Sequence, residues 1–161
     1  NGIILTCQGI PFLAGGVEVH KTKFGDENSY NSPDYINEIN WDYKKYHHRL
    51  FKYTQGVIKL RREHPAFRMT SAEDIKRYLN FHHSPEGTVV YSLHDHANND
   101  AWKTIVVVYN QNHYGVDITL LGEKWNVVVK GDQAGTEPID RVTGNKVHVS
   151  PISMMVLYQE D

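Results

Sequence analysis

The sequence has little of several features that mark particular classes of protein. Cys7 is the one cysteine among 161 residues, so no internal disulfide can form and the redox compartment is not indicated. No apolar run approaches the roughly 20 residues that a membrane-spanning helix needs, and no run of Lys or Arg exceeds two residues. The formal net charge is −2 with ten histidines taken as neutral. These absences argue against a nucleic-acid or membrane-surface partner.

The composition that remains is that of a globular protein. The chain is 40% apolar and 22% charged, which excludes a largely disordered chain. It begins Asn1-Gly2-Ile3, with neither an initiator Met nor a charged segment ahead of an apolar signal core. We therefore expect a cut end with any targeting segment upstream, and both a cytoplasmic and a secreted location stay open.

The first of two regions, residues 1–76, has the pattern of one β/α unit. The apolar run Ile3–Cys7 predicts a strand buried on both faces, as in a parallel sheet, with Cys7 as a buried structural thiol. A polar loop over 21–40, rich in Asn, Ser and Asp, follows it. The loop is long for a connection, which favours a functional role.

A long helix is predicted after this loop. Apolar and aromatic residues recur at spacings of three and four from Tyr43 to Leu60, which defines one stripe that packs in the core. Asn40 or Asp42 can cap the start of this helix, and Pro65 ends it. The stripe consists of Tyr43, Tyr46, Leu50, Tyr53, Val57 and Leu60.

The second region, residues 77–161, changes to short strands separated by turn residues. Seven strands at this spacing predict an antiparallel β-sandwich, with Ile105–Tyr109 in its central strand. The expected strands are 77–83, 88–94, 104–110, 116–121, 125–130, 146–149 and 154–159.

Several stretches together resemble one enzyme family in the expected order. Gln8–Gly16 is similar to the eighth barrel strand and following turn of the α-amylase clan of glycoside hydrolases. Asn28–Asp34, with sequence NSYNSPD, resembles the next loop of type I pullulanases in particular. Ile39–Trp41, which follows, belongs to the same loop resemblance. Leu60–Arg68 resembles the end of the following helix, and two stretches resemble strands of the C-terminal β-domain: Val106–Asn110 and Ser153–Leu157.

The resemblance implies an α+β fragment: the last β/α unit of a TIM barrel, residues 1–76, followed by the sandwich domain, residues 77–161. It also implies retaining hydrolysis of α-1,6 bonds in pullulan, amylopectin or limit dextrins, which needs two carboxyl groups about 5–5.5 Å apart. In the family these groups end earlier barrel strands. A barrel takes roughly 250 residues, so we expect no catalytic residue in this chain, no activity alone, and dependence on the upstream remainder of the polypeptide.

The resemblance places substrate contacts in the loop. Asp34 is expected to accept hydrogen bonds from sugar hydroxyls, and Tyr30 and Asn31 to line the same cleft. The alternative for Asp34 is a turn cap after Pro33. Lys21 can contact sugar or stay solvated. Three positions depart from the family pattern: Ala14 replaces a frequent His, Val17 a frequent Glu, and Lys21 the usual Arg.

Other residues suggest weaker alternatives. The remaining loop acids have no spacing that pairs two of them as a glycosidase site: Glu18, Asp26, Glu27, Glu38 and Asp42. The pairs His47/His48, His82/His83 and His94/His96 lack the spacing of a metal site, so no metal or other cofactor is expected. Trp102 and Trp125 are candidates for a sugar-stacking platform, against one core and one sheet-edge tryptophan.

Three functions are thus compared: the pullulanase fragment, an independent α-glucan-binding sandwich, and a fragment of another clan member such as an isoamylase. One physical expectation accompanies them. An isolated Ile3–Cys7 strand exposes apolar faces and two unpaired edges, so this chain should aggregate or pair with its missing partner.

Overall fold

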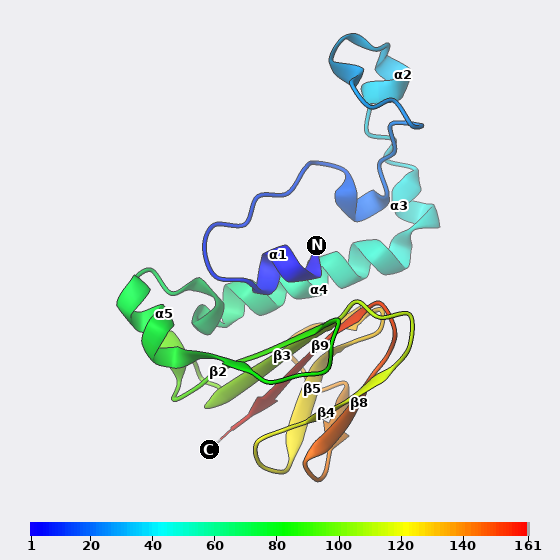
Figure 1. The fold of residues 1–161 in the computed structure, drawn as a ribbon. Coiled ribbons are helices and arrows are strands. Elements are labelled where there is room, and N and C mark those ends of the chain that lie inside the picture. The colour runs from blue at the N-terminus through cyan, green and yellow to red at the C-terminus, as the bar shows by residue number, and fades with distance from the viewer. Residues whose placement is uncertain (161) are drawn as a thin grey trace.

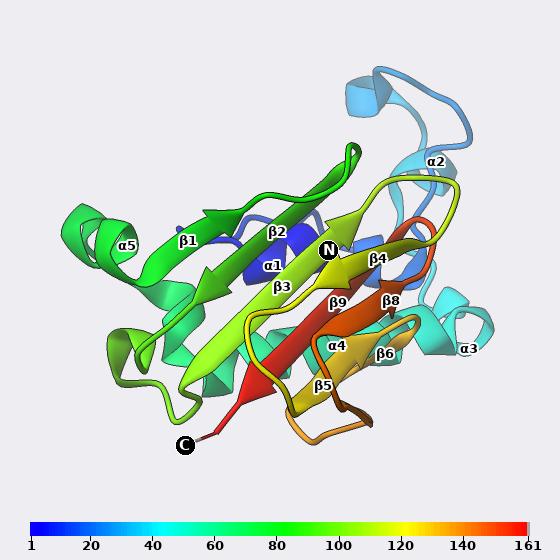
Figure 2. The same cartoon turned by 60° about the horizontal axis from the view of Figure 1, so that its bottom comes forward.

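An antiparallel sheet of seven strands forms the centre of the computed structural model, which describes residues 1–160 (Figures 1 and 2). The strands follow the order β1-β2-β3-β9-β5-β6, and β7 also pairs with β5. A second sheet consists of β4 (Val116–Thr119) and β8 (Lys146–Val149). The strands of the large sheet are β1 (Leu79–His82), β2 (Thr88–Leu93), β3 (Thr104–Asn110), β5 (Trp125–Lys130), β6 (Gln133–Ala134), β7 (Asp140–Val142) and β9 (Ser153–Gln159).

The apolar run in β3 is explained by burial of both sheet faces. Successive side chains of a strand point to opposite faces. Ile105 and Val107 accordingly belong to the core on the helical side, whereas Val106 and Val108 belong to the core under β4 and β8. The strand pairs with β2 and β9 along its length. The expected central strand is therefore confirmed.

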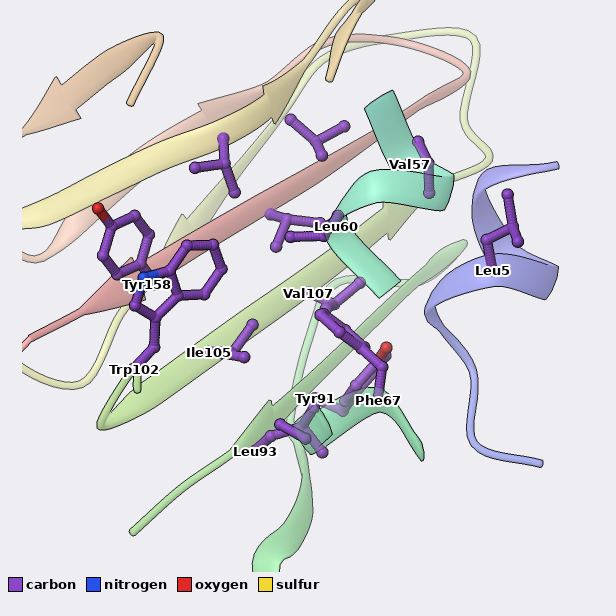
Figure 3. Packing of buried hydrophobic residues seen from close by; sticks show 14 of the residues in the cluster. Leu5, Val57, Leu60, Phe67, Tyr91, Leu93, Trp102, Ile105, Val107 and Tyr158 are labelled. Atoms are coloured by element: carbon purple, nitrogen blue, oxygen red, sulfur yellow. The ribbon is translucent and has the colours of Figure 1, made fainter. Parts of the chain in front are cut away.

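The sheet lies between two unequal layers. Helix α4 (His48–Glu63) crosses one face, where Val57 and Leu60 are fully buried beside Val107 (Figure 3). Gly56 allows this close approach, because a Cβ at position 56 would overlap the carbonyl oxygen of Ala134 in β6. The two-stranded sheet covers part of the other face. Cores on both faces make the arrangement a three-layer one.

The long helix is confirmed, with one break. It consists of α3 (Tyr43–Tyr46) and α4, separated at His47, and it ends at Glu63 before Pro65. The predicted stripe is buried at its C-terminal end, but Tyr46 is 79% exposed, so that part of the prediction is wrong. The N-cap of α3 is Asp42, which makes no side-chain cap bond, so neither expected cap is seen. Asn40 Oδ1 accepts a hydrogen bond from the Asp42 amide at 3.0 Å just before the helix.

All seven expected strands are present, with two additions and one shortened start. The short strands β6 and β7 were not predicted. Residues 77 and 78 belong to helix α5 (Ala72–Tyr78) and not to the first strand. Ser71 caps this helix, since its Oγ accepts from the Asp74 amide at 3.0 Å. The antiparallel sheets are confirmed, although the second layer of the described part has two strands.

The predicted strand Ile3–Cys7 is wrong. Residues Gly2–Thr6 form helix α1, and Cys7 is exposed, with its Sγ 3.9 Å from the Tyr109 hydroxyl. A buried parallel strand needs neighbours on both edges, whereas every strand pair in the described chain is antiparallel and excludes this segment. A helix satisfies the same backbone groups locally. The aggregation argument from bare strand edges therefore does not hold.

Apolar exposure near the N-terminus nevertheless remains. Ile10 is 97% exposed, Phe12 is 90% exposed and Ile3 is 57% exposed. Three further short elements lie in this region: the 3₁₀ turns Val17–Val19 and Ser29–Asn31 and the helix α2 (Asp34–Asn37). In the described chain no helix is both long and apolar enough to cross a membrane.

Candidate substrate-binding loop

The polar loop projects from the body of the molecule beyond the start of α4, with α2 at its far end (Figure 1). Its base is fixed by Gly16, whose φ of 92° suits glycine. The Gly16 carbonyl accepts a hydrogen bond from the Lys21 amide at 2.9 Å. A Cβ at position 16 would lie 2.8 Å from the Cβ of Lys21. Any larger residue here would displace the start of the loop.

The tip of the loop is held by side chains grouped around Asn37. The Asn37 Nδ2 donates to the carbonyls of Ser29 and Ser32 at 2.7 and 2.9 Å. Its Oδ1 accepts from Lys23 Nζ at 2.5 Å and from Ser29 Oγ at 2.9 Å. Asp26 adds a bond from Ser32 Oγ at 2.5 Å. We call this set, Lys23, Asp26, Ser29, Ser32 and Asn37, the loop clasp.

The clasp displays the predicted site residues on its surface. Tyr30 is 84% exposed and lies with Asn31 in the turn Ser29–Asn31, which the clasp fixes at both ends. Asp34 is exposed at the first position of α2. These three side chains therefore lie together at the tip of the loop. Within residues 1–160 none of these three side chains makes a hydrogen bond, so their polar atoms are free to meet a ligand.

Lys21 lies apart from that group, at the base of the loop. Its aliphatic part packs on Gly16, beside Ile39. The alternative role for Asp34 as a turn cap is not seen: α2 has no side-chain cap, and the Asp34 contact to Glu38 runs from the Glu38 amide to the Asp34 carbonyl at 2.7 Å. The carboxylate itself makes no such bond in residues 1–160.

Three of the other loop acids have local structural partners. Glu18 accepts from the Gly16 amide at 3.0 Å, and Asp42 pairs with Lys45 at 2.9 Å. Asp26 belongs to the clasp and also accepts from the Asn28 amide at 3.0 Å. These contacts hold the backbone of the loop in place, so the three acids have a structural role.

Arg61 and Gln8 connect the N-terminal segment to the helix. The buried Arg61 donates to the carbonyls of Leu5 and Cys7 at 3.1 and 2.7 Å, and to that of Gly9 at 2.5 Å. Burial lowers the pKa of this guanidinium, with Arg68 as a second cause. Gln8 donates to the Ala66 carbonyl at 2.8 Å and accepts from the Met69 amide at 3.1 Å. The segment leading into the loop is thereby anchored.

A buried cluster around Asp100 was not predicted from the sequence. Its carboxylate accepts from the amides of Ala66 and Trp102 at 3.1 and 2.9 Å and contacts His64 Nδ1 at 2.9 Å. Trp102 stacks between His64 and Tyr158, with ring centroids 3.3 and 3.8 Å apart. Trp102 is therefore a core residue.

The sugar-stacking platform is contradicted by burial. Trp102 is 7% exposed and Trp125 is 1% exposed, and they belong to the cores on opposite faces of the sheet. The expectation of a sheet-edge tryptophan is wrong as well. Trp41, after the loop, is instead 61% exposed.

The histidines have individual partners. His47 stacks on His20, His82 contacts Ser92 Oγ at 2.8 Å, and His94 contacts Asp95 at 3.0 Å. Within residues 1–160 no group of three or more His, Cys, Asp or Glu side chains could hold a metal ion.

A hollow of about 1,140 Å³ lies between α4 and the segment after β6. It combines apolar side chains, Leu13, Phe51 and Ile58, with charges of both signs, such as Glu18 and Lys59. A surface of this mixed kind suits packing against polypeptide.

Known proteins resemble this chain in both sequence and structure. Residues 75–133 match the family model described as the pullulanase all-beta domain. The pullulanase of Bacillus subtilis (strain 168) is 41% identical over 115 residues, which cover 71% of this chain and 16% of that protein. Isoamylase 1, chloroplastic, of Arabidopsis thaliana is 29% identical over 153 residues, 87% of this chain and 19% of that protein.

Solved structures extend the similarity to nearly the whole chain. The pullulanase from Bacillus acidopullulyticus is 40% identical with a TM-score of 0.94, covering 98% of this chain and 19% of that one. The pullulanase from Anoxybacillus sp. LM18-11 complexed with maltotriose is 33% identical, with a TM-score of 0.87, and the match covers 98% of this chain and 22% of that one. This chain thus spans about a fifth of the length of these relatives.

Proposed function

Because the chain belongs to the pullulanases, we propose that it forms the substrate-holding end of a debranching enzyme that hydrolyses α-1,6 bonds in pullulan, amylopectin and limit dextrins. The observation that carries this proposal is the loop of Tyr30, Asn31 and Asp34, which is exposed yet held in shape by the clasp. A preformed polar surface binds sugar without a large ordering cost. The pullulanase from Anoxybacillus complexed with maltotriose supports an α-glucan as the ligand.

The carboxyl groups that break the bond are assigned to the part of the longer polypeptide outside this chain. A retaining glycosidase needs a nucleophile and an acid about 5–5.5 Å apart, and the loop acids with recorded partners serve local structure instead. In this division Asp34 orients a sugar hydroxyl and Tyr30 supplies a ring for the sugar face. Lys21, at the base of the loop, extends the same contact surface.

The remainder of the polypeptide is the proposed partner of the N-terminal region. We assign residues 1–76 to the end of a catalytic TIM barrel and residues 77–161 to the β-domain. Exposed Ile3, Ile10 and Phe12, together with the hollow beside α4, offer an apolar surface for the rest of that barrel. The match to the Bacillus acidopullulyticus pullulanase, which covers 98% of this chain but 19% of that one, supports a place within a longer polypeptide.

An isoamylase-type enzyme is the second candidate, favoured by the 29% identity to Isoamylase 1, chloroplastic. Substrate preference separates the two, because a pullulanase acts on the short maltotriosyl units of pullulan. Preference for amylopectin with no action on pullulan would favour the isoamylase type.

Substitution of Asp34 in the longer polypeptide tests the proposal. Asp34→Ala should lower kcat/KM on pullulan about 10-fold or more, since loss of a hydrogen bond to a charged group costs about 1.5–3 kcal/mol. Asp42→Ala is the matched control, because Asp42 pairs with Lys45 on the surface, and it should leave kcat/KM within about 2-fold. Equal kinetics of the two variants would refute the role of the loop.

A further inference from the structure

On the side of β4 and β8, part of the large sheet has no second layer over it. We call this uncovered part, on β1 and β2, the shelf. The core under these two strands takes residues from β3, β5 and β9 and one residue, Val90, from β2. No residue of β1 contributes to it. Two strands cannot cover a seven-stranded sheet, so the face of β1 and β2 stays open beside the end of β4 (Figure 2).

A groove of about 390 Å³ occupies this shelf, at the small end of the range of small-molecule sites. The buried Val90, Val106 and Trp125 lie at its floor, and Leu121, which is 74% exposed, is its accessible apolar side chain. The segment that follows β4, which includes Leu120 and Leu121, closes one side. Gln159 lines the end of the groove and holds a nearby loop, because its Nε2 donates to the Glu123 carbonyl at 2.9 Å.

Four polar side chains of the groove come from the same face of two paired strands. Asn80 is opposite Ser92 and His82 is opposite Val90 in the β1–β2 register. Since every second residue shares a face, Ser92 and His94 follow Val90 on this face, and the groove collects all four polar side chains. His82 Nε2 contacts Ser92 Oγ at 2.8 Å, and Asn80 Nδ2 contacts His94 Nε2 at 2.9 Å.

These contacts leave hydrogen-bonding capacity unused. The Asn80 Oδ1 can accept two bonds, the second nitrogen of His82 can donate or accept, and the Gln159 Oε1 can accept. None of the residues lining this groove is Asp, Glu, Lys or Arg. The uncharged groups can both donate hydrogen bonds to and accept them from the hydroxyls of a neutral ligand. The apolar side chains can contact the C–H faces of its ring. A sugar has both features.

We propose that this groove is a second glucan site, which binds one or two glucose units of an α-1,4-linked chain away from the substrate loop. The choice of α-glucan among polyhydroxylated ligands rests on the proposed function. Such a site tethers a branched polymer while the loop holds the branch to be cut. Tethering raises the effective concentration of further branches near the loop.

Fluorine NMR of the 161-residue chain labelled with 5-fluorotryptophan tests the proposal directly. The three tryptophans report on separate places: Trp125 on the groove, Trp102 on the core and Trp41 on the end of the substrate loop. Titration with maltotriose should shift the Trp125 resonance. An unmoved Trp125 resonance at saturating maltotriose would overturn the proposal.

Two variants and one control assign the shift to the groove. Asn80→Leu removes the Asn80 Oδ1 and the contact to His94 and should weaken the apparent affinity at Trp125 about 3- to 10-fold. Thr119→Phe fills the groove from an exposed position on β4 and should abolish the shift. Asn145→Leu makes the same change at an exposed asparagine outside the groove and should bind like the parent. An unchanged Trp102 resonance verifies the fold of each variant.

The same titration separates this proposal from the proposed function. A Trp41 shift without a Trp125 shift supports the loop and refutes the groove. A Trp125 shift that survives Thr119→Phe also refutes the groove. A Trp125 shift that Thr119→Phe abolishes supports the groove even where the longer polypeptide fails to hydrolyse pullulan.

Discussion

The sheet region and the N-terminal region are stabilised in different ways. The sheet pairs its backbone strand to strand and has a core on each face, with Val107, Val127 and Leu157 fully buried. The region before α4 has short helices and turns, and its shape depends on side chains that bind backbone carbonyls, as Arg61 and Asn37 do. Its apolar residues Ile10 and Phe12 face outward.

This difference indicates which region depends on further polypeptide. A sheet with two cores has its apolar groups out of water within the chain itself. The N-terminal region reaches the shared core mainly through α4 and the turn that follows it, and it leaves other apolar side chains uncovered. We infer that the sheet region carries most of the stability and that the N-terminal region carries the contacts of the proposed substrate loop.

The largest expected effect follows from a buried phenylalanine that joins the two regions. Phe67 is fully buried in the core between α4 and the sheet. Phe67→Ala should lower the free energy of unfolding by about 3–5 kcal/mol through lost burial and a cavity. Phe12→Ala, at a site 90% exposed, should change it by less than about 0.5 kcal/mol in this chain. Urea denaturation measures both, and similar losses would remove the contrast between the regions.

A smaller effect is expected at Arg61. Arg61→Met should lower the free energy of unfolding by about 2–3 kcal/mol, because three carbonyls lose a charged donor. Arg62→Met is the neighbouring exposed control, with an expected change of less than about 0.5 kcal/mol. Hydrogen exchange of Arg61→Met should show a larger loss of protection, relative to the parent, in residues 2–9 than elsewhere. Loss spread evenly over β2 and β3 would contradict a local anchor.

The clasp should give a still smaller and local effect. Asn37→Ala removes contacts to Ser29, Ser32 and Lys23, and should destabilise the loop by about 1–2 kcal/mol with little change in Tm. Limited proteolysis should then cut residues 23–37 faster than in the parent. Asn28→Ala changes an exposed residue of the same loop, and the protease should cut this variant at the parental rate. Equal rates for both variants would show that the clasp does not hold the loop.

An effect confined to alkaline pH is expected where two tyrosines join α1 to the sheet. The Tyr91 hydroxyl donates to the Thr6 carbonyl at 2.6 Å, and the Tyr109 hydroxyl is 2.7 Å from Thr6 Oγ1. Burial raises the pKa of Tyr109 to about 12 and raises that of Tyr91 well above its ordinary value.

The sign of the effect follows from proton binding. Above pH about 10 the unfolded chain loses these tyrosine protons while the folded chain keeps them, so stability is complete below pH 10 and falls as the pH rises toward 12. Tyr109→Phe should flatten this decline, and Tyr35→Phe, at an exposed site, should not. Stability measured across this pH range checks the claim, which an unchanged slope in Tyr109→Phe would contradict.

Periodicity predicted the elements that have long, regular patterns. The central run Ile105–Tyr109 and the stripe leading to Leu60 lie where the sequence indicates, because packing on both faces or on one stripe repeats along the element. The five-residue run Ile3–Cys7 was ambiguous, since so short an apolar segment suits a strand or a helix equally. Helix α5 was missed although Ser71 and Asp74 carry a capping signal.

The candidate site could be predicted in part. The resemblance indicated Tyr30, Asn31 and Asp34, which the structure places together on one exposed loop. The clasp was not foreseen, because Asn37 meets Lys23 across 14 residues with no periodic signal. Asp100 was missed for the same reason, since its contact with His64 spans 36 residues. The groove beside β1 could not be predicted without knowing the register in which β1 and β2 pair.

The most direct test of this division of labour is the release of maltotriose from pullulan by the purified 161-residue chain. We expect none, with hydrolysis by the longer polypeptide under the same conditions, because the acid and nucleophile are assigned outside the chain. Release of maltotriose by the chain alone would contradict the account.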